Sequence, residues 1–206
     1  MVFIKVDSTA RYRHDRMLKK ILPSLRKMDG VVLDVGGGPR LYSDLLKPMK
    51  YESLDSMKEV HPDHCMDITE EIPNKKFDLV TTFQCLEHIR EPDAAIRNMS
   101  RTLKTSGILV GSTPFMWHYH SNKEYLDYYR YTEDGLRYLF EKYFGTVEIL
   151  PFGNSVLTFT RACGRVPFFG IPFNMCAKLI EFVFSKNSRY YPSGYIFICR
   201  DPKTTR

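Results

Sequence analysis

A run of three glycines follows a short apolar stretch near the start of the chain. The sequence reads LDVGGGPR over residues 33–40. Glycines directly after a buried strand let the backbone turn tightly and approach a ligand, because no Cβ atom stands in the way. Backbone N–H groups at the start of the following helical stretch favour an anionic group. We therefore predict a ligand site that includes Asp34, Gly36, Gly37 and Gly38.

A second acidic residue follows at the distance that suits a bound ribose. Asp55 ends the stretch YESLD, 21 residues after Asp34, and a carboxylate at about this interval can accept hydrogen bonds from both ribose hydroxyls. A nicotinamide or flavin dinucleotide site is disfavoured, because its G-x-G-x-x-G pattern would need a glycine where Leu41 stands. The pair of motifs instead indicates another nucleoside-containing ligand.

The histidines and acidic residues near position 63 could indicate a metal site, but a loop is the better-supported interpretation. His61, Asp63 and His64 lie close together in HPDHCMD, but no second pair stands at zinc spacing. We predict a loop here and no bound metal.

The elements that would position these residues alternate between strand and helix. The predicted strands are 31–35, 51–55, 77–84, 107–114, 145–150 and 194–200. The predicted helices are 9–28, 40–47, 93–103 and 132–144, the last with Thr132 as its N-cap. Such alternation indicates an α/β fold with a mostly parallel sheet.

Composition fits one ordinary globular domain. The chain has 206 residues, 43% of them hydrophobic, so we predict a single domain over 1–206 with an N-terminal helical segment over 1–30. The five cysteines form no C-x-x-C pair, no secretion signal is evident, and we expect a cytoplasmic protein. The net charge of +6 is spread along the chain, which makes a nucleic-acid partner unlikely in this interpretation.

These motifs, in this order, resemble the class I S-adenosylmethionine (SAM)-dependent methyltransferases, in particular the small type called methyltransferase type 11. The resemblance covers about 31–152 and the last strand. It implies a doubly wound, Rossmann-like sheet of seven strands, with 194–200 inserted antiparallel beside 145–150. It also implies SAM as cofactor and S-adenosylhomocysteine (SAH) as product.

The resemblance extends the set of cofactor-binding residues. Asp67 and the adjacent Ile68 are similar to the adenine side of the family's site. Phe83, Gln84 and Cys85 would lie beside the methionyl part of SAM, with Glu87 and His88 just beyond; His88 is included among the predicted cofactor contacts. One departure is Arg40, where the family commonly has a third glycine, and we expect it to place a cation near the methionine carboxylate.

An aromatic segment after 107–114 is the predicted acceptor wall. The sequence TPFMWHYHSNKEYLDYYRYT places histidines and tyrosines where ligands sit in such sheets, beyond the carboxyl ends of the strands. We predict His118 or His120 as a general base for a hydroxyl acceptor. The alternative for each is a surface histidine whose ring is simply hydrogen-bonded.

The acceptor itself is less well defined. The pattern HxxxxxYLDYYRYTxxGL resembles methyltransferases that modify sugars and surface polysaccharides, so a small or medium-sized acceptor with a sugar or glycolipid hydroxyl is the first hypothesis. The alternatives are a non-catalytic module that binds SAM or SAH, and an RNA methyltransferase, which would need a coherent basic face.

A longer aromatic insertion separates the last two predicted strands. Within 151–193, apolar residues recur at helical spacing over 173–184. We predict an amphipathic helix that covers the end of the sheet. A substrate lid, a dimer contact and a peripheral membrane contact are the alternatives, and prolines and charged residues within 166–184 argue against a membrane-spanning helix.

Overall fold

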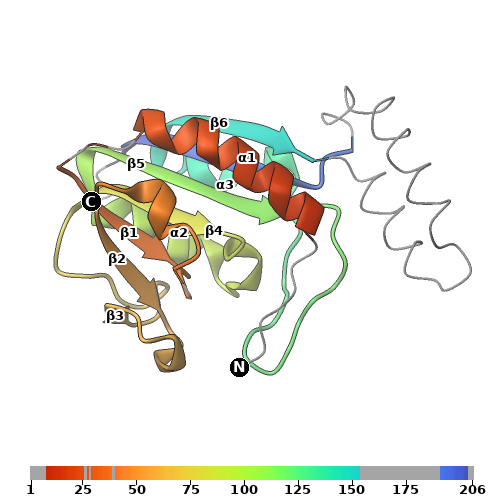
Figure 1. The fold of residues 1–206 in the computed structure, drawn as a ribbon, viewed down its shortest axis with the longest axis horizontal. Coiled ribbons are helices and arrows are strands. Elements are labelled where there is room, and N and C mark those ends of the chain that lie inside the picture. Colours follow the sequence, from red (N-terminus) through yellow and green to blue (C-terminus); the bar gives the residue numbers. More distant parts are fainter. Residues whose placement is uncertain (1–7, 26, 28, 39, 154–190, 204–206) are drawn as a thin grey trace, which may run out of the picture.

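The computed structural model describes residues 8–25, 27, 29–38, 40–153 and 191–203. These residues form a seven-stranded sheet with the strand order β3-β2-β1-β4-β5-β7-β6 (Figure 1). β7 pairs antiparallel with both β5 and β6, and the pairs among β1 to β5 are parallel. The predicted fold class is therefore confirmed, including the inverted last strand.

Six strands match the predicted ones within a few residues, and one was not predicted. The strands are β1 (Val31–Val35), β2 (Lys50–Asp55), β3 (His64–Cys65), β4 (Phe77–Phe83), β5 (Leu103–Pro114), β6 (Phe144–Phe152) and β7 (Gly194–Pro202). The short β3 lies where the sequence predicted only a loop. Its two residues pair with Leu54 and Asp55 at the end of β2, so their extended backbone depends on that neighbour and not on a local apolar pattern.

The helices cover both faces of the sheet. The α-helices are α1 (Ser8–Leu25), α2 (Pro92–Thr102) and α3 (Glu133–Glu141), and the short 3₁₀ helices are η1 (Ser43–Leu46), η2 (Lys58–Val60) and η3 (Leu86–His88). The predicted helix over 40–47 is wrong in type, since only η1 forms there before Pro48. The predicted cap of α3 is confirmed, because the Thr132 side chain accepts a hydrogen bond from the Gly135 amide at 3.1 Å.

Two apolar cores lie on opposite faces of the sheet. On one face, Leu18 and Leu22 of α1 are fully buried against strand residues such as Val110. On the other face, Ile96 of α2 and Phe140 of α3 pack in a larger core. The apolar strands buried on both faces explain why their sequences show continuous hydrophobic runs and not alternation.

Three further expectations concern the insertion, a membrane-spanning helix and the cysteines. The helix predicted over 173–184 lies outside the described residues, as does most of the insertion. No described helix has the length and apolar character needed to cross a lipid bilayer. Cys65, Cys85 and Cys199, the cysteines within the described ranges, are free thiols.

Candidate active site

The glycine turn after β1 has the backbone conformation that glycine favours. Gly36 and Gly38 have φ values of +70° and +36°, in the left-handed region where a side chain costs free energy. A Cβ on Gly36 would lie only 2.3 Å from Cys85 Sγ, so this glycine also lets the turn after β4 approach the turn after β1. The Gly36 amide donates to the Leu54 carbonyl at 2.8 Å, which ties the turn to β2.

The Asp34 side chain packs against this turn. Its carboxylate is buried and accepts hydrogen bonds from the hydroxyls of Tyr51 at 2.6 Å and Thr81 at 2.7 Å. A Cβ on Gly37 would lie 2.8 Å from the same carboxylate, so the turn rests directly on it. Asp34, predicted as a cofactor contact, is therefore held as a buried support for the turn by the strands on either side of β1.

Burial of Asp34 gives a pH-dependent contribution to stability. Burial raises the pKa of Asp34 from 3.8 to about 6, and the hydrogen bonds from Tyr51 and Thr81 offset this only in part. A carboxyl whose pKa is higher in the folded state contributes most stability below its unfolded pKa, and that contribution is lost as pH rises through the folded pKa.

We therefore expect the free energy of unfolding to fall by roughly 2 kcal/mol between pH 4 and pH 6 from this group alone. Urea unfolding at pH 4, 5, 6 and 7 measures this slope, with Asp34→Asn as the comparison. The Asn variant should show a flatter profile over the same window. Parallel profiles for the two proteins would contradict the assignment.

Asp55 lies at the end of β2, next to the glycine turn. Its carboxylate accepts from the Met57 amide at 2.9 Å and also interacts with the amides of Gly38 and Ser56, while burial raises the pKa of Asp55. A Cβ on Gly38 would meet its nearest neighbours, one of which is Asp55 Oδ2, only at 3.9 Å. The structure thus brings Gly38 and Asp55 into van der Waals range of each other, which is the juxtaposition that the predicted ribose site needs.

Asp67 and Ile68 follow β3 on the same edge of the sheet. Asp67 is exposed, and its carboxylate accepts from the amide and the hydroxyl of Thr69, both at 2.8 Å. Ile68 is buried, and its carbonyl accepts from the side-chain amide of Asn98 in α2 at 2.8 Å. A buried helix residue thus fixes this segment where the resemblance places the adenine side of the site.

The residues after β4 complete the edge of the site. Phe83 is buried, whereas Gln84 is exposed with a φ of +51°. The Gln84 amide donates to the Ser112 carbonyl at 2.9 Å, and its side chain donates to Ser112 Oγ at 3.1 Å. The buried His14 of α1 lies 2.7 Å from the same Ser112 hydroxyl. Helix α1 therefore reaches the carboxyl ends of β4 and β5 through a hydrogen-bond chain.

Arg40 has two partners in the fold that the sequence did not predict. Its guanidinium forms an ion pair with Asp63 at 2.9 Å and lies over the Tyr51 ring at 5.5 Å. Asp63 also accepts from the Ser53 amide at 2.8 Å. The cation is engaged with the segment before β3, and its place near the methionine carboxylate stays a prediction. The same pairing uses the Asp63 carboxylate, and His64 pairs with Glu52, so these residues gather no metal-binding set with His61.

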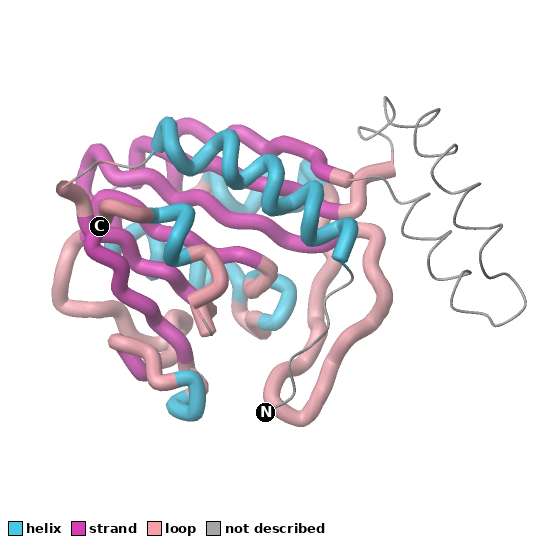
Figure 2. The backbone as a smooth tube through the Cα atoms, in the orientation of Figure 1, coloured by secondary structure: helices cyan, strands magenta, loops and turns pink. Residues whose placement is uncertain are grey.

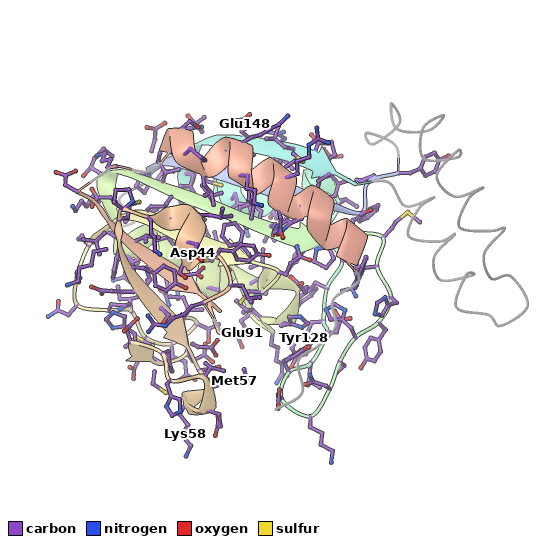
Figure 3. The ribbon with its side chains drawn as sticks, in the orientation of Figure 1. Asp44, Met57, Lys58, Glu91, Tyr128 and Glu148 are labelled. Atoms are coloured by element: carbon purple, nitrogen blue, oxygen red, sulfur yellow. The ribbon has the colours of Figure 1, made fainter. Side chains whose placement is uncertain are left out.

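The aromatic segment 115–131 leaves the end of β5 as a long loop and returns before α3 (Figure 2). Its amides at Tyr128 and Tyr129 donate to the Glu87 carbonyl at 2.9 and 3.2 Å, which docks the loop on η3. Figure 3 shows Tyr128 on this loop and Met57 directly after β2, both beyond the carboxyl ends of the strands. The loop thus borders the edge where the residues predicted to bind the cofactor meet.

A buried carboxylate joins two limbs of this loop, one around residues 118–120 and the other around residues 127–130. Asp127, whose side chain is 1% exposed, accepts two hydrogen bonds from Arg130 and one from the His120 amide at 3.0 Å. The Arg130 guanidinium also donates to the His118 carbonyl at 3.1 Å. The cation and the neighbouring amide hold the pKa of Asp127 at about 2 despite its burial, so this pair is charged at neutral pH.

The two predicted bases have different surroundings. His118 is exposed, and its ring lies 5.1 Å from that of Trp117. His120 is half-buried, with Nδ1 3.1 Å from Asp127 Oδ2 and its ring 4.9 Å from the ring of His88. The His120 ring lies beside a residue of η3, so the structure gives different surroundings to two histidines that the sequence could not distinguish.

Glu87 lies beneath these histidines and was not among the predicted site residues. Its side chain is fully buried, which raises its pKa to about 8, and its Oε2 accepts from the Thr113 hydroxyl at 3.3 Å. One ligand atom each from Glu87, His88 and His120 lies within 4.8 Å of the others. Glu87 and His88 are adjacent in LEHI, whereas their partner His120 stands 32 residues after His88 in the sequence. No motif spacing predicts this grouping.

Comparison with known proteins places the chain in a family. A model described as a methyltransferase domain matches residues 7–144, whereas a search of curated proteins gave no significant match. Among solved structures, a SAM-dependent methyltransferase from Archaeoglobus fulgidus is 16% identical with a TM-score of 0.61, and the match covers 92% of this chain and 93% of that one. The N-methyltransferase NodS from Bradyrhizobium japonicum, in complex with SAH, is 14% identical with a TM-score of 0.59, covering 97% and 91%.

A longer enzyme is also similar. Phosphoethanolamine N-methyltransferase 2 from Haemonchus contortus, in complex with phosphomonomethylethanolamine and SAH, is 15% identical with a TM-score of 0.57. The match covers 91% of this chain but 53% of that enzyme, so this chain spans about half of its length. At these identities the structures establish the fold, and the family model establishes the family. The chain belongs to the class I, SAM-dependent methyltransferases.

Proposed function

We propose that this chain binds SAM along the carboxyl edge of β1, β2 and β4 and transfers its methyl group to a small or medium-sized acceptor. The observation that carries the proposal is the meeting of the left-handed glycine turn with Asp55, whose Oδ2 would lie 3.9 Å from a Cβ on Gly38. Glycine backbone on one side and a carboxylate on the other are what a nucleoside with ribose hydroxyls requires.

The remaining cofactor contacts follow from their places along the same edge. Ile68 is proposed to contact the adenine and Asp67 its polar edge. Phe83, Gln84 and Cys85 are proposed to lie along the methionyl part of SAM, with His88 nearer the methyl group. The thiol of Cys85 stays neutral, because burial raises its pKa to about 12, so it is proposed as a packing contact and not as a nucleophile.

The acceptor is proposed to lie between this edge and the loop 115–131. Methyl transfer needs in-line attack on the sulfonium, so holding the acceptor at a short distance supplies most of the rate enhancement. The aromatic side chains of the loop favour a cationic sulfonium as well as an apolar acceptor. A histidine of the loop, His118 or His120, is proposed to take the acceptor's proton when the nucleophile is a hydroxyl.

Acceptors of different size would suit this arrangement. The small amine phospho-ester bound by the Haemonchus contortus enzyme supports a small molecule. The sugar or glycolipid hydroxyl is a narrower proposal that rests on the loop's sequence pattern alone. An RNA acceptor and a role in SAM binding without catalysis are outcomes that the experiment below separates.

Calorimetry of SAM and SAH binding tests the proposal directly. Asp55→Asn is expected to weaken SAM binding by about 10- to 100-fold, because charge-assisted hydrogen bonds to the ribose are lost. Asp78→Asn is the matched control, since Asp78 lies at the opposite end of β4, where it pairs with Lys104 at 2.8 Å. It should leave the SAM affinity within about twofold, if the cofactor lies where we propose.

Release of SAH in the presence of acceptor mixtures then distinguishes the outcomes. Turnover with small metabolites supports the proposed function. Turnover with RNA alone would mean that the acceptor is RNA and not a small molecule. SAM binding without turnover on any mixture supports the non-catalytic module. Absence of SAM binding by the wild-type chain would reject all three.

A further inference from the structure

Two histidines and a carboxylate converge where η3 meets the loop 115–131. We propose that Glu87, His88 and His120 bind a divalent transition-metal ion. A side-chain oxygen or nitrogen of each lies within 4.8 Å of the other two, although they come from separate segments of the chain. The proposal replaces the sequence-based expectation of no metal, and ion binding by itself does not depend on methyl transfer.

The buried carboxylate of Glu87 provides the first independent argument. Its Oε1 is buried without a hydrogen-bond partner among the described residues, and it lies 3.8 Å from His88 Nε2. A buried polar atom without a partner costs free energy, and such atoms in folded proteins call for an explanation such as an ion. A cation at this point would give the buried oxygen a partner.

The hydrogen bonds of His88 provide the second argument. Its Nδ1 lies 2.7 Å from the Leu126 carbonyl, and a carbonyl can only accept, so the proton is on Nδ1. The Nε2 atom then carries a free lone pair on the side of Glu87. Histidines that bind metals show this arrangement, with the second ring nitrogen donating to a carbonyl or carboxylate.

His120 has the corresponding arrangement with a carboxylate. Its Nδ1 lies 3.1 Å from Asp127 Oδ2 and 3.1 Å from the His118 carbonyl. The Arg130 guanidinium, which can only donate, lies farther from Nδ1 at 3.3 Å, so the two closer oxygens favour a proton on Nδ1 and leave the Nε2 lone pair for a ligand. Asp127 is in turn fixed by Arg130, so an ordered outer set of residues orients the histidine.

The donor set indicates the kind of ion and its use. Two imidazoles and one carboxylate suit zinc, manganese or ferrous iron better than calcium or magnesium, which prefer oxygen ligands. Ligand atoms around a tetrahedral zinc ion lie about 3.4 Å apart at the usual zinc–nitrogen distance. Binding would therefore require the ligand atoms, which lie within 4.8 Å of one another, to approach by no more than about 1.4 Å.

Three protein ligands leave at least one coordination position open. If the proposed methyl transfer holds, an acceptor oxygen could occupy that position, where the ion would orient it and lower its pKa. His120 would then be a metal ligand, and His118 would be the histidine left to act as a base. This last step rests on the proposed function, whereas the metal site does not.

Zinc binding to the full chain, stripped of metal by a chelator, tests the site. Competition with a chromogenic zinc chelator is expected to show one ion per chain with a micromolar or tighter dissociation constant. Glu87→Gln and His120→Gln should each weaken binding at least tenfold, since each removes a ligand. Cobalt substitution should give the visible absorption of a four- or five-coordinate site in the wild-type chain alone.

His61→Asn is the matched control, because His61 is exposed and its φ of +51° is one that asparagine tolerates. It should bind zinc as the wild type does. Equal zinc affinity in Glu87→Gln, His120→Gln and the wild type, or no saturable binding by the wild type, would overturn the proposal. SAM calorimetry on the same variants shows that they are folded and keeps a failure of the metal site distinct from a failure of the methyltransferase assignment.

Discussion

Replacing Gly36 by alanine is expected to lower the affinity for SAM by at least about 100-fold, or roughly 2.7 kcal/mol. The new Cβ would lie 2.3 Å from Cys85 Sγ and 2.8 Å from its Cβ, far inside van der Waals contact. The φ of +70° adds about 1–2 kcal/mol of backbone strain for any residue with a side chain. Both costs fall on the turn that the proposed cofactor must contact, so the turn after β1 should move away from the turn after β4.

The collision with Cys85 can be tested apart from the backbone strain. Cys85→Gly in the Gly36→Ala background removes both colliding atoms, and it should restore at least tenfold of the lost SAM affinity. Gly153→Ala is the control, because Gly153 also has a left-handed φ, +73°, and its Cβ would meet Ser193 Oγ at 2.5 Å. That control should lower the melting temperature but leave the SAM affinity nearly unchanged. Unchanged calorimetric affinity in Gly36→Ala would exclude the glycine turn from the cofactor site.

Much of this fold follows from local sequence signals. Buried parallel strands appear in the sequence as apolar runs, and the helices between them show a 3.6-residue period of apolar residues. The order of elements was therefore predictable. The cap at Thr132 was predictable for the same reason, since it depends on residues three positions apart. The two-residue β3 was not, because its pairing with β2 alone makes it a strand.

The candidate site also contains residues that local sequence signals predict and residues that only tertiary contacts bring together. Gly36, Gly38 and Asp55 were identifiable, because each stands at the end of a strand that the sequence reveals. His14 could not be connected with the site, since its partner Ser112 is 98 residues away. The direction of the Arg40 side chain depends on Asp63 in another turn.

The grouping of Glu87 with His120 depends on a loop without regular secondary structure, whose path is fixed by tertiary hydrogen bonds such as the one from the Tyr128 amide to the Glu87 carbonyl. Residues on one strand end can be placed from sequence, whereas residues that meet across loops require the structure. The part of the site assigned to the acceptor is of this second kind, which explains why two histidines seemed equivalent before the fold was known.

Asp127→Ala should open the loop 115–131 and leave the cofactor edge intact. The carboxylate joins the limb at His120 to the limb at Arg130, and its side chain is 1% exposed. Removing one partner of a buried ion pair costs about 3–5 kcal/mol, because the other charge loses its compensation. Local opening of the loop should therefore become at least about 100-fold more frequent, which hydrogen–deuterium exchange of residues 115–131 measures.

Asp44→Ala provides a matched control for this variant. Asp44 pairs with Lys47 at the same i,i+3 spacing as Asp127 with Arg130, but its side chain is 85% exposed. An exposed pair contributes about 0–1 kcal/mol, so this variant should exchange like the wild type. In Asp127→Ala the SAM affinity should stay within about threefold, while zinc affinity should fall about 10- to 100-fold, because His120 loses the partner that orients it. A parallel loss of SAM affinity would mean that the loop supports the cofactor itself. Retained zinc affinity with an opened loop would mean that the ion does not engage His120, since a histidine on a mobile limb cannot keep its place beside Glu87.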